Sequence, residues 1–337
     1  MITARNVSSP WLLLPAAAAA TLLLAYHTLA TSPPPSNRLP TPTDPGLASL
    51  PPDSRAREIY PEDWVKGGKY VQLPMGRVRY WLVGPANGKK ITLIHGLSLP
   101  SFVFQHLIPL LTAENYQVLV YDLYGRGYSD APRATPYDAK LYVTQLALLL
   151  QHIGWAKTHV LGFSMGGAIA ASFVAAFPEL VERDVVLVAS VGVWGPMPQM
   201  KYRHLPGVER RTIRSMFGNI VQQQYKHLPG FGHAVVSSLL EGPVSTSKWA
   251  FECEAWKGRR VLLVHGTEDD VVPLHQIRSV IHTSTSSSKH PHSDNNNEAW
   301  APASLETADI VGGTHDVVYT HPMEVGKVVL GFLGGSR

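Results

Sequence analysis

The sequence is poor in cysteine and in charged residues. Its 337 residues include a single cysteine, Cys253, so no disulfide can form within the chain and the fold needs no oxidising compartment. Charged residues make up only 16% of the chain, which excludes a disordered or coiled-coil protein. The net charge is only +4, and the basic residues are scattered rather than gathered in a run that could follow a phosphate backbone. We therefore expect no nucleic-acid partner.

The amino-terminal part contains one long uncharged run, Trp11–Ala30. A helix of this length measures about 30 Å, which matches the hydrocarbon core of a bilayer. We interpret residues 1–31 as a membrane anchor and expect a single-pass membrane protein of the endomembrane system. A signal peptide cleaved near Ala30, which would give a secreted protein, and a mitochondrial transit segment are the alternatives. Residues 32–59 are rich in proline, and we interpret them as an extended linker.

From about residue 60, short apolar runs alternate with stretches of helical spacing. Runs of this kind, bounded by Gly or Pro, are typical of strands buried on both faces. They are Ile91–Ile94, Val118–Tyr121, His159–Gly162, Val185–Val188 and Val261–Val264. The alternation predicts an α/β domain over residues 60–337, with a mostly parallel sheet and helices on both of its faces. It is interrupted at about residues 194–257, where we predict an inserted helical cap.

A Gly-x-Ser-x-Gly motif, Gly162–Gly166, lies between a predicted strand and a predicted helix. A serine hydroxyl is a weak nucleophile unless it is exposed and a neighbouring base removes its proton. A sharp strand-to-helix turn exposes the hydroxyl, and it leaves room only for small residues two positions to either side. The motif in this context predicts Ser164 as a nucleophile.

Two later loops carry candidates for the acid and the base. The run Val261–Val264 leads into an acidic loop in which Asp269 can orient a histidine, with Glu268 and Asp270 as rival candidates. His315 follows a short apolar run near the carboxyl end, and it is the best candidate for the base among fifteen histidines. The order Ser, Asp, His along the chain is the order expected when the serine lies on a strand-to-helix turn.

The same chemistry requires two N–H donors for the oxyanion of a tetrahedral intermediate. Met165, directly after the serine, supplies one. Leu97, in the loop that follows Ile91–Ile94, fits best as the other. We expect His95 to brace this loop rather than to react.

With these motifs, the chain from about Val71 to Leu333 resembles the α/β-hydrolase superfamily. The resemblance is carried by His95-Gly96, by Asp122, Gly125, Gly127 and Ser129 in their characteristic spacing, by Gly162–Gly166, by Gly266–Pro273 and by His315. The chain looks most similar to the esterases, monoacylglycerol lipases and cofactor-free haloperoxidases of that group. The resemblance implies a serine hydrolase that cleaves small-molecule carboxylic esters with an apolar or lipid-like part through an acyl-enzyme, with neither a metal nor an organic cofactor.

The fold leaves the chemistry open, because one fold hosts many reactions. The enzymatic alternatives are a haloperoxidase or perhydrolase and a C–C bond hydrolase that use the same three residues. The non-enzymatic alternative is a small-molecule receptor with little turnover.

Overall fold

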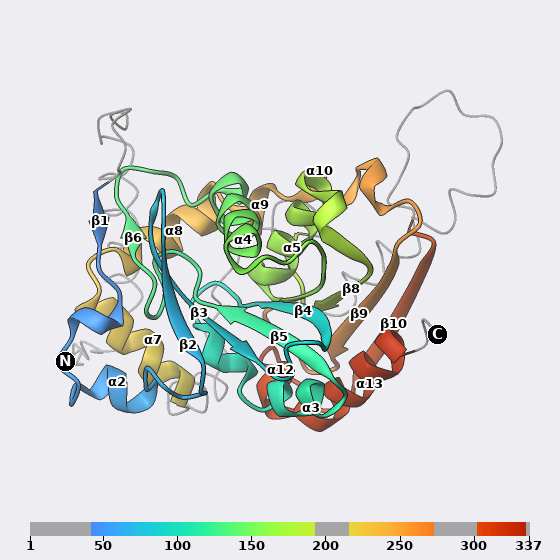
Figure 1. Cartoon of the computed structure of the whole chain (residues 1–337), viewed down its shortest axis with the longest axis horizontal. Coiled ribbons are helices and arrows are strands. Elements are labelled where there is room, and N and C mark those ends of the chain that lie inside the picture. Colours follow the sequence, from blue (N-terminus) through green and yellow to red (C-terminus); the bar gives the residue numbers. More distant parts are fainter. Residues whose placement is uncertain (1–41, 193–215, 273–301, 335–337) are drawn as a thin grey trace, which may run out of the picture. The chain divides into compact units, whose positions relative to one another are not determined.

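The computed structural model describes residues 42–192, 216–272 and 302–334 (Figure 1). Within these ranges the chain forms a sheet of eight strands in the order β10-β9-β8-β7-β4-β5-β3-β2. Only β3 runs antiparallel to both of its neighbours, and the other adjacent strands are parallel. The strands are β2 (Gly68–Leu73), β3 (Gly76–Val83), β4 (Lys89–Ile94), β5 (Tyr116–Tyr121), β7 (Thr158–Phe163), β8 (Val181–Val188), β9 (Arg260–Gly266) and β10 (Ser304–Ile310).

The central strands bury side chains on both faces of the sheet. In β8, Val185 and Leu187 belong to the hydrophobic cluster on one face, whereas Val186 and Val188 belong to the cluster on the other. This period of two is the geometry of an extended chain, and burial on both faces explains why these strands read as continuous apolar runs. The predicted α/β fold with a mostly parallel sheet is confirmed.

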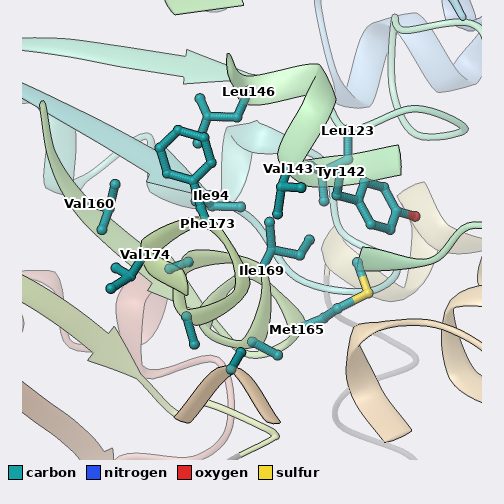
Figure 2. Packing of buried hydrophobic residues seen from close by; sticks show 14 of the residues in the cluster. Ile94, Leu123, Tyr142, Val143, Leu146, Val160, Met165, Ile169, Phe173 and Val174 are labelled. Carbon is teal, nitrogen blue, oxygen red and sulfur yellow. The ribbon is translucent and has the colours of Figure 1, made fainter. Parts of the chain in front are cut away.

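Helices cover both faces of this sheet (Figure 1). On one side lie α4 (Ala139–Ile153) and α5 (Met165–Ala176), and on the other lie α3 (Leu107–Ala113), α12 (Val317–Thr320) and α13 (Pro322–Gly334). Figure 2 shows Ile169 and Phe173 of α5 among Val143 and Leu146 of α4. Because α5 is apolar on nearly all sides, it is almost entirely buried.

The chain between β8 and β9 is helical over its described part. It contains α7 (Met216–His227), α8 (Phe231–Leu240), α9 (Pro243–Thr246) and α10 (Lys248–Phe251), which we call the inserted helices. Helices α9 and α10 contact α5, and α7 contacts α2 (Arg55–Ile59). They lie where we predicted a cap at residues 194–257, although residues 193–215 are outside the described ranges. The boundaries of that cap stay a prediction.

Part of the segment that we assigned to the linker packs onto the domain. Strand β1 (Thr43–Asp44) pairs with β6 (Ala131–Pro132), and a short helical turn, η2 (Leu47–Ser49), precedes α2. Leu47 and Ala56 are fully buried. Burial of these side chains stabilises the segment against the domain, which its proline content did not reveal. Residues 42–59 therefore belong to the folded part of the chain.

The predicted single-pass membrane localisation needs correction. Among the residues that the structure describes, no helix is both long enough and apolar enough to cross a bilayer. The run Trp11–Ala30, on which we based that prediction, lies outside these residues.

The start of α5 passes very close to the end of β4. A Cβ atom on Gly166 would lie 2.0 Å from the carbonyl oxygen of Ile94, and one on Gly162 would lie 2.2 Å from the carbonyl oxygen of Gly166. These distances are far shorter than van der Waals contact, and the atoms in the way belong to the backbone. The glycines are therefore required by the packing of the turn that carries Ser164.

We predict that Gly166→Ala lowers the free energy of unfolding by about 3 kcal/mol, at the upper end of the cost of overpacking a core. Gly331→Ala is the matched control, because Gly331 is exposed in helix α13 and a Cβ there meets nothing within 4 Å. The control should gain about 0.5 to 1 kcal/mol, since alanine favours a helix over glycine. Urea unfolding of both variants measures the difference. Equal stabilities would show that the turn has room for a side chain.

Candidate active site

Four loops meet at the carboxyl edge of the parallel strands. They follow β4, β7, β9 and β10, and they carry Leu97, Ser164, Asp269 and His315, respectively. In open α/β sheets, ligands bind at this edge, in the crevice between loops that lead from adjacent strands to opposite faces of the sheet. The topology thus brings together residues that are far apart in the sequence.

Ser164 occupies the sharp turn between β7 and α5 in a strained backbone conformation. Its φ of 55° and ψ of −120° are rarely adopted by residues other than glycine. Such a conformation costs about 1 to 3 kcal/mol and persists only when its surroundings enforce it. Here the N–H of Ser164 donates to the carbonyl of Val188 (2.9 Å), and its own carbonyl accepts from the N–H of Val191 (3.2 Å). The end of β8 and the loop that follows it therefore hold the turn.

His315 connects Ser164 to Asp269. Its Nε2 lies 2.9 Å from Ser164 Oγ, and its Nδ1 lies 2.9 Å from Asp269 Oδ2. With Asp269 ionised, Nδ1–H donates to the carboxylate and Nε2 accepts the serine hydroxyl proton. The imidazole ring also lies beside Phe163, with 5.5 Å between the ring centroids. The structure thus brings together the three residues that we predicted as nucleophile, base and acid.

Asp269 is a buried carboxylate whose two oxygens both have donors. Oδ1 accepts from the N–H groups of Val271 (3.0 Å) and Val272 (2.8 Å), while Oδ2 accepts from His315. The rival acids Glu268 and Asp270 are exposed. Asp269 is the acid that His315 contacts, because the turn directs its side chain inward and those of its two neighbours outward.

Backbone hydrogen bonds fasten the loop of Asp269 to the loop of His315. Thr267 N–H donates to Ile310 O (3.0 Å), and Glu268 N–H donates to Gly313 O (2.9 Å). A third bond runs from Gly312 N–H to Thr267 Oγ1 (2.9 Å). The relative position of acid and base is therefore set by the backbone and not by their side chains alone.

His265 is a second histidine at Asp269, and the sequence did not reveal it. It is buried at the end of β9, with Nε2 at 2.5 Å from Val272 O and 3.3 Å from Asp269 Oδ2. Burial lowers its pKa below the usual value, so the ring is neutral. Because Nδ1 has no partner among the described residues, the proton resides on Nε2, which donates toward Val272 and Asp269. Its position directly after the apolar run Val261–Val264 is the one sequence signal that could have indicated a buried histidine.

The two predicted oxyanion donors belong to segments that adjoin Ser164. Met165 is the first residue of α5, so its N–H has no acceptor within the helix. Leu97 lies in the loop of residues 95–100, which we call the oxyanion loop. A Cβ atom on Gly96 in that loop would lie 3.1 Å from Ser164 Cβ, which shows how closely the loop approaches the serine.

His95 braces the oxyanion loop, as the sequence indicated. Its Nε2 accepts from the N–H of Leu123 (2.9 Å), and its Nδ1–H donates to Gly96 O (2.9 Å). Burial lowers the pKa of His95 to about 3, so it stays neutral and keeps this tautomer. A neutral ring with both nitrogens engaged has no role as a base.

Asp122 anchors the far end of the same loop. Its carboxylate is fully buried and accepts from both the N–H (3.0 Å) and the hydroxyl (2.7 Å) of Ser101. It also accepts from the hydroxyl of Tyr60 (3.0 Å) and the N–H of Tyr128 (2.8 Å). The aspartate of the Asp122–Ser129 motif therefore ties the oxyanion loop to the loop after β5 and to the segment before β2.

In residues 42–192, 216–272 and 302–334, no three His, Cys, Asp or Glu side chains are grouped so that they could hold a metal ion. The donors that the site does offer are hydroxyl, imidazole, carboxylate and backbone N–H groups. This set is suited to proton transfer and nucleophilic attack.

Comparison with known families agrees with the fold. The sequence model of the α/β-hydrolase fold family matches residues 91–228, a stretch that includes the turn at Ser164. The chain has the α/β-hydrolase fold, and over this stretch its sequence is similar to that family.

The chain covers very different shares of the curated proteins that it resembles. A magnesium-chelatase 30 kDa subunit of Rhodobacter capsulatus is 27% identical over 64% of this chain and 84% of its own length. A serine hydrolase-like protein of Danio rerio is 32% identical, but over only 34% of this chain and 35% of its own length. The chain thus matches about a third of the latter protein.

Solved structures resemble most of the chain at low sequence identity. A bromoperoxidase from Bacillus anthracis is similar with a TM-score of 0.61 and 20% identity, over 80% of this chain and all of that one. A putative lipase from Acinetobacter baumannii is similar with a TM-score of 0.64 and 16% identity, over 84% of this chain and 96% of that one. These similarities show the shared fold.

We predict that Asp269→Asn lowers the rate of ester hydrolysis on the order of 10⁴-fold, because an amide at this position favours the wrong tautomer of His315. Asp270→Asn is the matched control, since its exposed side chain lies one residue away in the same loop. Steady-state hydrolysis of a nitrophenyl ester compares the two variants. A greater loss in Asp270→Asn would mean that the acid is misassigned.

A second prediction concerns stability at acid pH. The pKa of His95 is about 3 in the folded chain and 6.5 in the unfolded chain, so between these values the unfolded chain binds a proton that the folded chain does not. Stability is therefore complete above pH 6.5 and falls as the pH drops. From pH 6.5 to pH 4.5, His95 should account for a loss of about 2 to 3 kcal/mol.

Urea unfolding at the two pH values tests this in His95→Gln, which we expect to lose about 2 kcal/mol less than wild type over the same interval. His106→Gln is the control, because its ring is exposed, and it should lose as much as wild type. Burial also lowers the pKa of His159 and His265, and their contribution is present in all three proteins. The same acid loss in His95→Gln and wild type would contradict the account of His95.

Proposed function

We propose that this chain is a serine hydrolase that cleaves carboxylic esters through an acyl-enzyme at Ser164. The observation that carries the proposal is the chain of two 2.9 Å contacts from Asp269 through His315 to Ser164 Oγ, on a strained turn at the carboxyl edge of the sheet. A buried carboxylate, an imidazole between it and the hydroxyl, and a serine hydroxyl on a sharp turn are the three groups that nucleophilic acyl transfer needs.

In the first half of the reaction, His315 Nε2 takes the proton of Ser164 as Oγ attacks the ester carbonyl. The carbonyl oxygen becomes an oxyanion, which the N–H groups of Leu97 and Met165 stabilise. His315 then gives the proton to the leaving alcohol as the C–O bond breaks. Asp269 stabilises the imidazolium that exists between these two transfers.

In the second half, a water molecule replaces the alcohol. His315 Nε2 takes a proton from the water as its oxygen attacks the acyl carbon, and the oxyanion forms again at the same N–H groups. When the intermediate collapses, Ser164 regains its proton from His315 and the carboxylic acid leaves. All the protons pass through His315, so no metal or organic cofactor is required.

The proposed substrates are esters with an apolar acyl or alkyl part. Support comes from the apolar inserted helix α8 and from the similarity to a putative lipase. A panel of nitrophenyl esters of increasing acyl length tests this preference.

The second candidate is a perhydrolase, and the similarity to a bromoperoxidase favours it. In that reaction hydrogen peroxide takes the place of water, the acyl group leaves as a peracid, and the peracid oxidises bromide. Adding peroxide and bromide to the ester assay separates the two activities. Bromination faster than ester hydrolysis would favour the second candidate, with the same residues in the same roles.

We predict that Ser164→Ala reduces ester hydrolysis on the order of 10⁶-fold without loss of folding. Ser172→Ala is the matched control, because Ser172 is a buried serine of the same helix whose hydroxyl donates only to Ala168 O (2.8 Å). It should retain activity. Wild type should react with a fluorophosphonate probe, and Ser164→Ala should not. Hydrolysis by pure Ser164→Ala at the wild-type rate would refute the proposal.

A further inference from the structure

Three consecutive carbonyl groups of the oxyanion loop each accept a side-chain hydrogen bond. Gly96 O accepts from His95 Nδ1 (2.9 Å), Leu97 O accepts from Arg126 Nε (2.8 Å), and Ser98 O accepts from Gln224 Nε2 (3.1 Å). The carbonyl and the N–H of a trans peptide point in opposite directions. Holding the carbonyl of Gly96 therefore directs the N–H of Leu97, and holding the next two carbonyls keeps the loop from rotating.

Gln224 comes from the inserted helix α7 and is fully buried. While its Nε2 donates to Ser98 O, its Oε1 accepts from the N–H of Gly127 (2.8 Å). The amide thus bridges the oxyanion loop and the loop after β5. Without a donor in this place, the carbonyl of the partly buried Ser98 would lose its hydrogen bond to the protein.

Arg126 connects the same loop to the inserted helix α8. The guanidinium is fully buried and, besides Leu97 O, it donates to Tyr124 O (3.0 Å) and to the hydroxyl of Tyr142. Its second terminal nitrogen donates to Ala234 O (3.2 Å) and Ser238 Oγ (3.0 Å), both on α8. These five bonds use all five N–H groups of arginine. None is left for a substrate, so Arg126 acts as a rigid brace.

We propose that the inserted helices α7 and α8 position the oxyanion loop through Gln224 and Arg126, so that the insertion completes the oxyanion site instead of only covering the sheet. The inference rests on the proposed function, because it concerns the same oxyanion. Both side chains are positioning residues, since they reach the reaction only through the loop. Anything that shifts α7 or α8, including a substrate bound against them, then alters the rate as well as the affinity.

Gln145 provides a matched control for Gln224. It is also a buried glutamine, and its Oε1 accepts from a backbone N–H (Tyr124, 3.1 Å) while its Nε2 donates to a backbone carbonyl (Asp122, 3.0 Å). Neither partner belongs to the oxyanion loop. Gln224→Leu and Gln145→Leu therefore remove the same bonds from equally buried places, and we expect similar losses of thermal stability.

The test measures kcat and KM for a nitrophenyl ester, with the active fraction of each protein taken from its burst amplitude. Gln224→Leu should lower kcat per active site about 10- to 100-fold, because small displacements of catalytic groups have effects of this size. KM should change by less than about threefold, since the loop acts on the transition state. Gln145→Leu should keep kcat within about twofold. Arg126→Lys, which retains the charge but not the five N–H groups, should behave like Gln224→Leu.

Equal kcat values in the two leucine variants would overturn the inference. A Gln224→Leu variant whose burst amplitude falls while its kcat per active site is unchanged would also overturn it. If the leucine variants do not fold, Gln224→Glu and Gln145→Glu replace them, because each keeps the acceptor and loses only the donor.

A readout independent of activity separates this inference from the proposed function. Hydrogen exchange of the peptide at residues 95–105 should be faster in Gln224→Leu and unchanged in Gln145→Leu. Wild type that neither hydrolyses the ester nor reacts with the fluorophosphonate probe, together with this exchange pattern, would refute the proposed function and leave the coupling intact. Equal exchange in the two variants would overturn the coupling.

Discussion

The strained backbone at Ser164 is the constraint on which the rest of the site depends. A φ of 55° at a serine is stable only because the surrounding chain leaves no other path. Gly162 and Gly166 allow β4, β7 and α5 to approach within backbone contact, and Val188 holds the turn from the adjacent strand. The packing of the central sheet offsets the free-energy cost of the strained backbone at Ser164. The turn places the Ser164 hydroxyl at the carboxyl edge of the sheet, at hydrogen-bond distance from His315.

The other groups reach the serine from separate loops, and each loop is fixed by buried polar side chains. Asp269 accepts from two backbone N–H groups and from two histidines, so its orientation is set before a substrate binds. Asp122 fixes one end of the oxyanion loop, and His95 fixes the other. Buried polar groups of this kind stabilise a structure only when all of their hydrogen bonds are made. The arrangement is therefore preorganised, which is what electrostatic stabilisation of an oxyanion requires.

The sequence predicted what is encoded locally. Apolar runs gave the central strands, and the motif around Ser164 placed the turn between a strand and a helix. The approach of Asp269 and His315 was predicted only through their order along the chain. Gln224 and His265 were not predicted, because the sequence does not show whether a polar residue is buried or which carbonyl group it contacts. The packing of residues 42–59 was also not predicted. The many prolines indicated a linker, and the segment is held by only a few buried apolar residues, such as Leu47. The membrane prediction used hydropathy alone, and it is corrected by the described helices.

The central claim is that Ser164 forms a covalent acyl intermediate, and the most direct measurement is to trap that intermediate. The protein is mixed with 4-nitrophenyl acetate, quenched in acid within the burst, digested and analysed by mass spectrometry. The account predicts one acetylated site, Ser164, on the peptide that spans the turn from β7 to α5, with an occupancy that follows the burst amplitude. Rapid hydrolysis of the ester with no acetylated peptide, or with the acetyl group on another residue, would contradict it.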